Sequence, residues 1–161
     1  MKSLLILRHG KAEAFNESSD KSRVLAERGI RDAKKMGELI LEKTGTPDLI
    51  VSSDAARARQ TAEIASKAAH YKAAIDFRPE IYNASMGRLI QVVESLPESA
   101  KTVLIVGHNP GLFDLAGYLI NGNLESELPT CGLVHLHVPV KWDEAIIGTA
   151  KLVGEYIPKN L

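Results

Sequence analysis

The sequence predicts a three-layer α/β fold, in which helices cover both faces of a mostly parallel central sheet and an antiparallel strand closes one edge. Short apolar runs, typical of strands buried on both faces, alternate with longer segments of helical periodicity. The alternation continues along the chain without an internal repeat or a low-complexity linker. The 161 residues suit a single domain, residues 1–161, with one sizeable core.

Each element is predicted from the spacing of its apolar residues and from the residues that start or stop it. Asp54 is expected to N-cap the second helix, and Pro110 fits the first turn of the fourth. In the first helix, Ile30, Ala33 and Ile40 mark the expected inward face. The predicted strands lie at 3–7, 49–52, 74–77 and 102–106, and the predicted helices at 27–43, 55–69, 89–96 and 110–120.

The C-terminal part of the chain changes character. Residues 133–138 and 145–152 are predicted to form an antiparallel strand pair at one edge of the sheet, and the chain is expected to fray from Glu155 onward. His135 and His137 share one face of the first of these strands. A solvent-facing pair is the favoured interpretation, and a zinc site is the weaker alternative.

The composition is that of an ordinary globular protein, with 45% hydrophobic and 25% charged residues. Twenty basic residues balance twenty acidic ones, which gives no electrostatic argument for nucleic acid or an anionic membrane as a partner. The apolar run before Arg8 is too short for a signal peptide, and no stretch is long enough to span a bilayer. We therefore expect a cytoplasmic protein. Cys131, the only cysteine, excludes an intrachain disulfide and is expected to act as a small buried hydrophobe.

Two histidines follow predicted strands, at the point where each strand ends. His9 lies in an Arg-His-Gly tripeptide after the first strand, and His108 lies in Gly-His-Asn-Pro after the fourth. In open α/β sheets, ligands bind at the carboxyl ends of the strands, so the two histidines meet if their strands are neighbours. Either histidine alone is more often a structural residue, but two in matching positions beside glycines favour a functional site. The guanidinium of Arg8 at a buried strand end favours a permanent anion as ligand.

Four short motifs occur in order along the chain, each in its expected strand or helix context. They are Arg-His-Gly at 8–10, Leu-Ala-Glu-Arg-Gly at 25–29, Ser-Ser-Asp-Ala-Ala-Arg-Ala-Arg-Gln-Thr at 52–61, and Val-Gly-His-Asn-Pro at 106–110. With these motifs the chain resembles the histidine phosphatase superfamily, and within it the small bacterial SixA-like phosphohistidine phosphatase branch. The resemblance extends from residue 4 to about residue 119.

The resemblance implies a role for each matched residue. His9 is expected to be the nucleophile that accepts the phosphoryl group, and Arg8, Arg57 and His108 are expected to hold the phosphoryl oxygens. This agrees with the physics of phosphoryl transfer, in which positioning and electrostatic stabilisation of the oxygens dominate. Neighbouring arginines also lower the pKa of a histidine, which keeps the nucleophile neutral. No metal and no cofactor is expected, and Arg59 is expected on a different, solvated helix face.

Four further residues near these motifs have open roles. Glu80 is the obvious candidate for a general acid, and a plain loop carboxylate is an alternative of similar weight. Asn16 and Ser18 follow the first motif and are candidates for substrate binding through phosphate contacts. Lys11 either adds charge at the pocket rim or is an ordinary surface lysine. The short segment before the second histidine leaves no room for a lid, which predicts an open, shallow site.

The expected function is that of a metal-independent phosphatase that forms a covalent phosphohistidine on His9 and dephosphorylates phosphohistidine on a signalling or phosphotransfer protein. A departing imidazole can be protonated and leave neutral, whereas an alkoxide needs a general acid, so a site without a dependable acid suits phosphohistidine. One alternative is a phosphatase of small phosphate esters, which a true acid at Glu80 favours. A second is an inactive module that binds a phosphorylated ligand, although a binder needs no nucleophile. A mutase is disfavoured, because it must exclude water.

Overall fold

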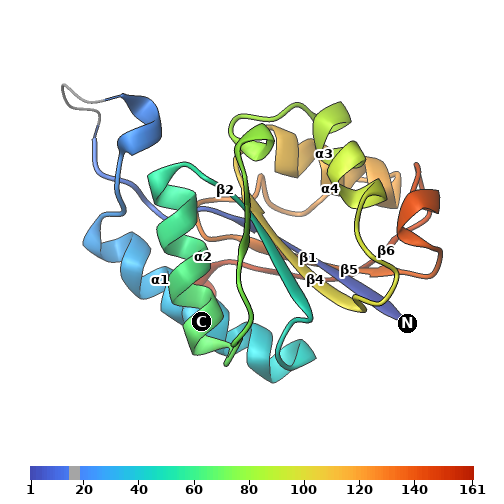
Figure 1. The fold of residues 1–161 in the computed structure, drawn as a ribbon, viewed down its shortest axis with the longest axis horizontal. Helices are drawn as coiled ribbons and strands as arrows, with labels where there is room; N and C mark the ends of the chain where they lie inside the picture. The colour runs from blue at the N-terminus through green and yellow to red at the C-terminus, as the bar shows by residue number, and fades with distance from the viewer. Residues whose placement is uncertain (15–18) are drawn as a thin grey trace.

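The computed structural model describes residues 1–14 and 19–161, and six strands within these ranges form one mixed sheet (Figure 1). The strands are β1 (Lys2–Arg8), β2 (Leu49–Ser53), β3 (Asp76–Arg78), β4 (Thr102–Gly107), β5 (Leu133–Val138) and β6 (Lys151–Tyr156). Their order across the sheet is β3-β2-β4-β1-β5-β6. The first four strands pair in parallel, whereas β5 pairs antiparallel with both β1 and β6. The mostly parallel sheet with an antiparallel edge is therefore confirmed.

Two pairs of helices cover the two faces of the sheet and complete the predicted three layers (Figure 1). These helices are α1 (Glu27–Thr44) and α2 (Ala56–Ala68) on one face, and α3 (Met86–Glu94) and α4 (Gly111–Ile120) on the other. In β1, Leu5 and Leu7 pack with the first pair, while Leu4 and Ile6 pack with the second. This strand is buried on both faces, which explains its continuous apolar run.

The two strands that carry the histidine motifs are neighbours and end together. In the parallel pair β1–β4, Arg8 lies beside Gly107, and the N–H of His9 donates to the carbonyl of Gly107 over 3.0 Å. The condition for the two histidines to meet is thus confirmed. Both are delivered to the same edge of the sheet, at the carboxyl ends of adjacent strands.

Helix α3 begins at Met86 rather than at residue 89, and two residues of the other helices are placed differently from the prediction. Helix α2 has Ala55 rather than Asp54 at its N-cap. The Asp54 carboxylate instead pairs with Lys21 Nζ at 3.0 Å, and this attraction to a distant segment is invisible in the local sequence. In α1, Ile30 is 45% exposed. The buried stripe of α1 includes Gly29, and the next residue is turned by about 100° around the helix toward solvent.

The C-terminal strand lies later in the sequence than predicted. β6 covers Lys151–Tyr156 rather than residues 145–152, and the expected fraying from Glu155 is wrong. The Glu155 carboxylate accepts hydrogen bonds from the backbone N–H groups of Glu125 at 2.8 Å and Ser126 at 3.2 Å. These bonds tie the strand to a distant loop, and such long-range contacts leave no local pattern in the sequence.

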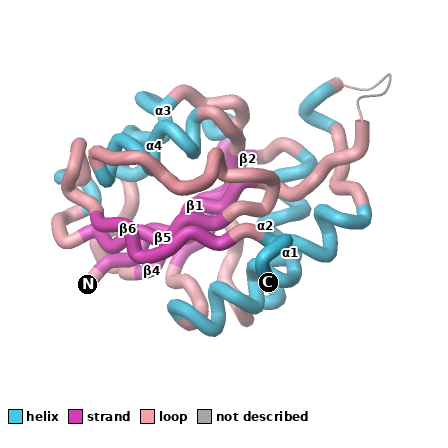
Figure 2. The backbone as a smooth tube through the Cα atoms, turned by 180° about the vertical axis from the view of Figure 1, so that it is seen from behind, coloured by secondary structure: helices cyan, strands magenta, loops and turns pink. Residues whose placement is uncertain are grey.

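The strand that carries His135 is not at the edge of the sheet, because β5 lies between β1 and β6 (Figure 2). The expectation of a solvent-facing histidine pair is therefore wrong for His135, which is 8% exposed and whose Nε2 lies 3.0 Å from Ser3 Oγ. Burial lowers the pKa of His135. Cys131 is buried, as expected, and burial raises its pKa to about 12.

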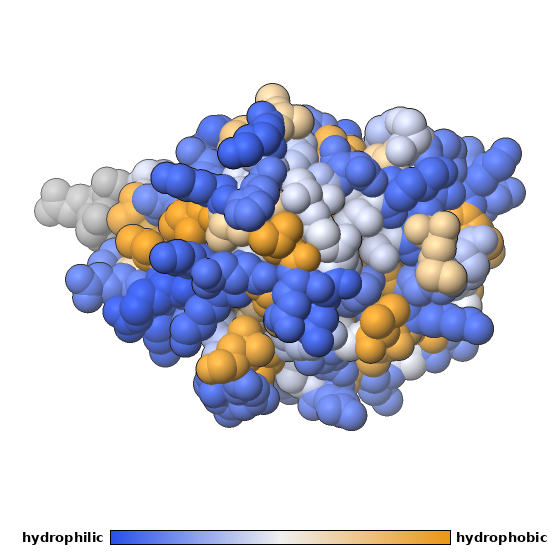
Figure 3. All heavy atoms as spheres, turned by 90° about the horizontal axis from the view of Figure 1, so that it is seen from below, coloured by the Kyte–Doolittle hydropathy of each residue, from blue (hydrophilic) through white to orange (hydrophobic). Residues whose placement is uncertain are grey.

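The surface is mainly polar on the face shown in Figure 3, where hydrophilic side chains surround separate hydrophobic patches. Within the two described ranges, no helix combines the length and the hydrophobicity needed to cross a bilayer.

Candidate active site

A pocket of about 270 Å³ opens at the carboxyl ends of β1 and β4. The structure brings the four main predicted residues together here, since Arg8, His9, Arg57 and His108 all line this pocket. Arg57 reaches it from the first turn of α2, which begins directly after β2. The other lining residues are Lys11, Ala12, Arg23, Asn83, Asn109 and Thr130.

The loop after β1 is held close to two helices by a pair of glycines and one hydroxyl group. A Cβ atom on Gly10 would lie 3.0 Å from the backbone of Gly29, so the close approach of loop and helix depends on a glycine there. The N–H of Gly10 donates to Thr61 Oγ1 at 3.0 Å, and that hydroxyl donates to the carbonyl of Arg57 at 2.7 Å. Helix α2 thereby fixes the loop that carries His9 relative to Arg57.

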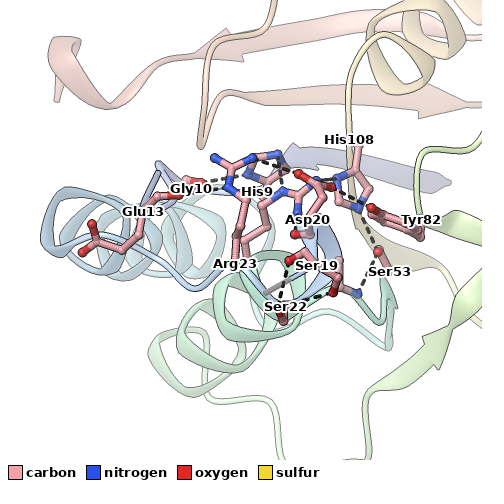
Figure 4. A network of polar contacts seen from close by, with 12 residues as sticks. His9, Gly10, Glu13, Ser19, Asp20, Ser22, Arg23, Ser53, Tyr82 and His108 are labelled. Carbon is pink, nitrogen blue, oxygen red and sulfur yellow. Dashed lines mark hydrogen bonds and ion pairs between the residues drawn. The ribbon is translucent and has the colours of Figure 1, made fainter. Parts of the chain in front are cut away.

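His9 is oriented by one neighbour that accepts a hydrogen bond and one that donates a hydrogen bond (Figure 4). Its Nδ1 lies 2.8 Å from the carbonyl of Gly10, which can only accept, and its Nε2 lies 3.4 Å from Arg57 Nε, which can only donate. The ring is therefore neutral, with its proton on Nδ1 and a lone pair on Nε2. Burial, helped by the charges of nearby arginines, lowers the pKa of His9 to about 4 although the bond to Gly10 raises it. A neutral ring with an available lone pair is the form a nucleophile needs.

His108 is oriented the other way round. Its Nδ1 lies 3.4 Å from Arg57 Nη2, which can only donate, so Nδ1 accepts. Its Nε2 lies 2.8 Å from Ser53 Oγ and carries the proton of the neutral ring (Figure 4). Burial, and then the neighbouring His9 and Arg57, lowers the pKa of His108 to about 3. The two imidazole rings lie 5.1 Å apart between centroids.

Four cationic side chains line the pocket, namely Arg8, Arg57, Arg23 and Lys11, whereas Arg59 does not line it. The side chain of Arg57 is 6% exposed and faces both histidines. Arg8 Nη1 donates to the carbonyl of Leu128 at 3.3 Å, whereas its buried Nε has no hydrogen-bond partner among the described residues. A buried cationic N–H of this kind favours an anionic oxygen. Arg59 is exposed, and its guanidinium lies 3.8 Å from the ring centroid of Phe77.

The remaining candidates are placed differently. Glu80 is exposed on a short 3-10 helix, Pro79–Ile81, and is not among the residues that line the pocket. Lys11 is exposed and does line it. Asn16 and Ser18 lie outside the described residues, so their phosphate contacts stay predictions.

The sequence analysis missed a carboxylate and a phenol beside Arg57. Asp20 accepts hydrogen bonds from Arg57, Arg23 and Tyr82. Tyr82 lies two residues after the candidate acid Glu80, but a tyrosine there gives no specific signal in the sequence. Asp20 gave none either, because two of its partners come from elements far away along the chain.

The arrangement combines a neutral imidazole, whose Nε2 bears a lone pair, with fixed cationic donors in one small pocket. Such a site suits phosphoryl transfer, in which the protein positions the group and stabilises the charge on its oxygens. In the part of the chain that the structure describes, no three His, Cys, Asp or Glu side chains cluster closely enough to hold a metal ion.

Comparison with known proteins identifies the family. The model of the histidine phosphatase superfamily (branch 1) matches residues 4–89, and the chain belongs to this superfamily. The protein Rv1276c of Mycobacterium tuberculosis is 31% identical over 164 residues, which cover 95% of this chain and 100% of that protein.

Solved structures with the same fold are found among SixA proteins. The candidate phosphohistidine phosphatase SixA from Agrobacterium tumefaciens is 30% identical, with a TM-score of 0.80 and 98% of each chain covered. The candidate SixA from Nakamurella multipartitia is 26% identical, with a TM-score of 0.83, and 98% of this chain and 96% of that chain are covered. A protein histidine phosphatase SixA in complex with tungstate has a TM-score of 0.85 at 22% identity, with 98% of each chain covered, a likeness of fold.

Proposed function

We propose that this protein is a metal-independent phosphatase that works through a covalent phosphohistidine on His9. The observation that carries the proposal is the position of His9 Nε2, which lies 3.4 Å from the donor Nε of Arg57 inside the pocket. The carbonyl of Gly10 holds the proton on the opposite ring nitrogen, so Nε2 carries no proton and accepts only the hydrogen bond from Arg57 Nε. A module that only binds a phosphorylated ligand has no need of this arrangement.

The reaction has two displacement steps at phosphorus. In the first, Nε2 of His9 donates its electron pair to phosphorus, and the bond to the leaving atom breaks with its electron pair going to that atom. In the second, a water oxygen attacks phosphorus, the electrons of the P–N bond return to Nε2, and both protons of the water leave with inorganic phosphate. Splitting one difficult hydrolysis into two displacements lowers the barrier.

The arginines and His108 hold the phosphoryl oxygens during both steps. Arg57 and Arg8 provide fixed, permanently charged donors to the equatorial oxygens. His108 is neutral in the free protein, because its pKa is about 3. A phosphoryl dianion raises that pKa, since an opposite charge favours the protonated ring, and Nδ1 then becomes a donor.

The substrate class that fits this site is phosphohistidine on another protein. An alkoxide leaving group needs a proton from a general acid, and the candidate acid, Glu80, is exposed and outside the pocket lining. An imidazole leaving group is protonated on its free nitrogen near neutral pH and departs without such help. The exposed position of Glu80 therefore favours phosphohistidine over a phosphate ester.

A larger hollow of about 690 Å³ adjoins the pocket and supports a protein as the carrier of the phosphohistidine. The two hollows share Arg8, Asn109 and Thr130. The larger one adds the cations Arg28, Lys35 and Lys159 and the carboxylates Asp32 and Glu127. With Arg8, cations outnumber carboxylates, so an acidic surface around the phosphorylated histidine of a partner fits this hollow by charge.

The test compares kcat/KM for a phosphorylated histidine-phosphotransfer domain with that for several sugar and nucleotide phosphates. We expect the phosphorylated protein to be preferred and Glu80→Gln to leave that preference intact. Glu63→Gln, at an exposed position on α2, is the matched control for loss of one surface carboxylate. A preference for small esters, together with a large loss in Glu80→Gln on those esters, contradicts the phosphohistidine assignment.

A further inference from the structure

We propose that Asp20 is a positioning residue which, together with Tyr82, fixes the direction of the Arg57 guanidinium for phosphoryl transfer. Asp20 begins a 3-10 helix, Asp20–Ser22, that contacts α2. The inference rests on the proposed function, because the direction of Arg57 matters to catalysis only if a phosphoryl group binds beside it.

Arg57 uses two different edges of its guanidinium. Nη1 donates to the backbone carbonyl of Asp20 at 3.0 Å, and Nη2 donates to Asp20 Oδ2 at 3.2 Å. The other edge, formed by Nε and Nη2, faces His9 Nε2 and His108 Nδ1, each at 3.4 Å. Since the guanidinium is planar and rigid, a clamp on the first edge sets the direction of the second. A phosphoryl group held between the two histidines meets this second edge.

Asp20 is itself held by two further donors (Figure 4). The hydroxyl of Tyr82 donates to Oδ2 at 2.6 Å, and Arg23 Nη1 donates to Oδ1 at 3.0 Å. Arg23 is anchored in turn, because its Nε donates to the carbonyl of Glu13 at 2.9 Å. The hydrogen bonds from Tyr82 and Arg23 lower the pKa of Asp20 to about 2, so the clamp is ionised at neutral pH. Tyr82 also packs edge-on against His108, with ring centroids 5.4 Å apart.

The charge of Asp20 opposes phosphate binding, whereas its geometry favours phosphoryl transfer. A carboxylate near a phosphate dianion repels it, so Asp20 does not serve to raise affinity. A fixed edge of Arg57 stabilises the oxygens of the transition state, where a small misplacement costs rate. Loss of Asp20 should therefore lower kcat, while KM and the dissociation constant for inorganic phosphate stay unchanged or fall.

The experiment compares Asp20→Ala and Asp20→Asn with Asp54→Asn as a matched control. Asp54 pairs with the same 3-10 helix through Lys21 at 3.0 Å, so its loss loosens that helix without removing a contact to Arg57. With the phosphohistidine substrate we expect kcat to fall about tenfold or more in Asp20→Ala. Asp20→Asn should lose less, because its amide oxygen still accepts one hydrogen bond. Calorimetric titration with inorganic phosphate reports binding separately.

Two further measurements test whether Asp20 acts through Arg57. In an Arg57→Ala background, Asp20→Ala should cost nothing more, because the group it positions is gone. The 15N relaxation of Arg57 Nε should show a rigid side chain in the parent protein and in Asp54→Asn, and a mobile one in Asp20→Ala. This NMR measurement needs no turnover, so an inactive parent protein refutes the proposed function while the positioning role is still tested.

Three outcomes overturn the positioning role. The first is a loss of kcat in Asp54→Asn as large as in Asp20→Ala, which makes the effect a general loosening of the 3-10 helix. The second is an unchanged kcat with tighter phosphate binding, which makes Asp20 a competitor of phosphate. The third is an Arg57 side chain that is equally rigid without Asp20. If Asp20→Ala does not fold, Asp20→Asn decides by the same measurements.

Discussion

The ends of β1 and β4 hold their histidines in opposite ways. At the end of β1, the Nδ1–H of His9 donates a hydrogen bond to the backbone carbonyl of Gly10. At the end of β4, the Nε2–H of His108 donates a hydrogen bond to the hydroxyl oxygen of Ser53 on β2. Opposite ring nitrogens therefore face Arg57, namely Nε2 of His9 and Nδ1 of His108.

This difference separates two residues that look equivalent in the sequence. Nε2 lies between two ring carbons that bear only hydrogen, whereas Nδ1 adjoins the carbon that bears the side-chain stem. Phosphorus therefore approaches Nε2 of His9 with less crowding than Nδ1 of His108. The comparison supports the proposal that His9 attacks phosphorus and that His108 holds an oxygen.

Removal of the His9 imidazole should have the largest effect. We expect His9→Ala to lower kcat/KM by on the order of 10³-fold or more, because no nucleophile is left. His108→Ala should keep measurable turnover, since His9 and both arginines remain. Steady-state kinetics measures both, and circular dichroism checks that the variants fold. If His108→Ala is the less active of the two, the assignment is reversed.

The protonation of His9 should differ strongly from that of an ordinary histidine. Its pKa of about 4, against 6.5 for a free histidine, corresponds to about 300-fold weaker proton binding. Because the pKa is lowered, the neutral nucleophile persists as the pH falls and is lost only near pH 4. An NMR titration should leave the imidazole signals of His9 and His108 unchanged between about pH 8 and pH 5.5. A His9 midpoint near 6.5 contradicts the neutral-ring account.

Arg57 and Arg59 offer a comparison within one helix. Arg57→Ala should lower kcat/KM by about 100-fold, as the loss of one donor to a developing charge does. Arg59→Ala should change kcat/KM little, because its guanidinium stacks on Phe77. Kinetics on the same substrate decides, and equal losses in the two variants show that Arg57 is not the residue that holds phosphate.

The hydrogen bond between His108 and Ser53 should matter less. Ser53→Ala removes the partner of Nε2, and we expect kcat/KM to fall about fivefold, since a neutral hydrogen bond contributes about 1 kcal/mol. Ser52→Ala is the matched control, because Ser52 is equally buried and donates to the carbonyl of Ser53 rather than to the histidine. Similar losses in both variants indicate a general effect on β2.

Chelation should have no effect. In the proposed mechanism Arg8 and Arg57 neutralise the charge of the phosphoryl group, so turnover should be unchanged after dialysis against EDTA. Activity lost on chelation and restored by a divalent cation contradicts the arginine-based account.

Most of the fold could be predicted because its strands and helices carry their own hydrophobic patterns. The apolar run of β1 gives its burial directly, and the neighbouring tripeptide places His9 at its end. The position of β6 could not be predicted, because it depends on hydrogen bonds from the distant loop at Glu125 and Ser126 to the Glu155 carboxylate. The burial of His135 likewise follows from the neighbours of β5 in the sheet, which no local pattern contains.

The residues of the candidate site also fall into two groups, those that a local sequence pattern predicts and those that depend on distant contacts. Arg8, His9, Arg57 and His108 follow strand ends or begin a helix, so regular structure brings them together. Asp20 joins them from a short 3-10 helix, and its partners Arg57 and Tyr82 lie far away along the chain. Residues of that kind become visible only when the partners of Arg57 are known.

The central claim is that His9, and not His108, carries the phosphoryl group. The direct test is rapid mixing with the phosphorylated substrate, an alkaline denaturing quench that preserves phosphohistidine, and peptide mass spectrometry. We expect phosphate on the peptide that contains His9 in the parent protein and in His108→Ala, and none in His9→Ala. Phosphate on the peptide that contains His108, or turnover by His9→Ala at a rate close to that of the parent protein, contradicts the account.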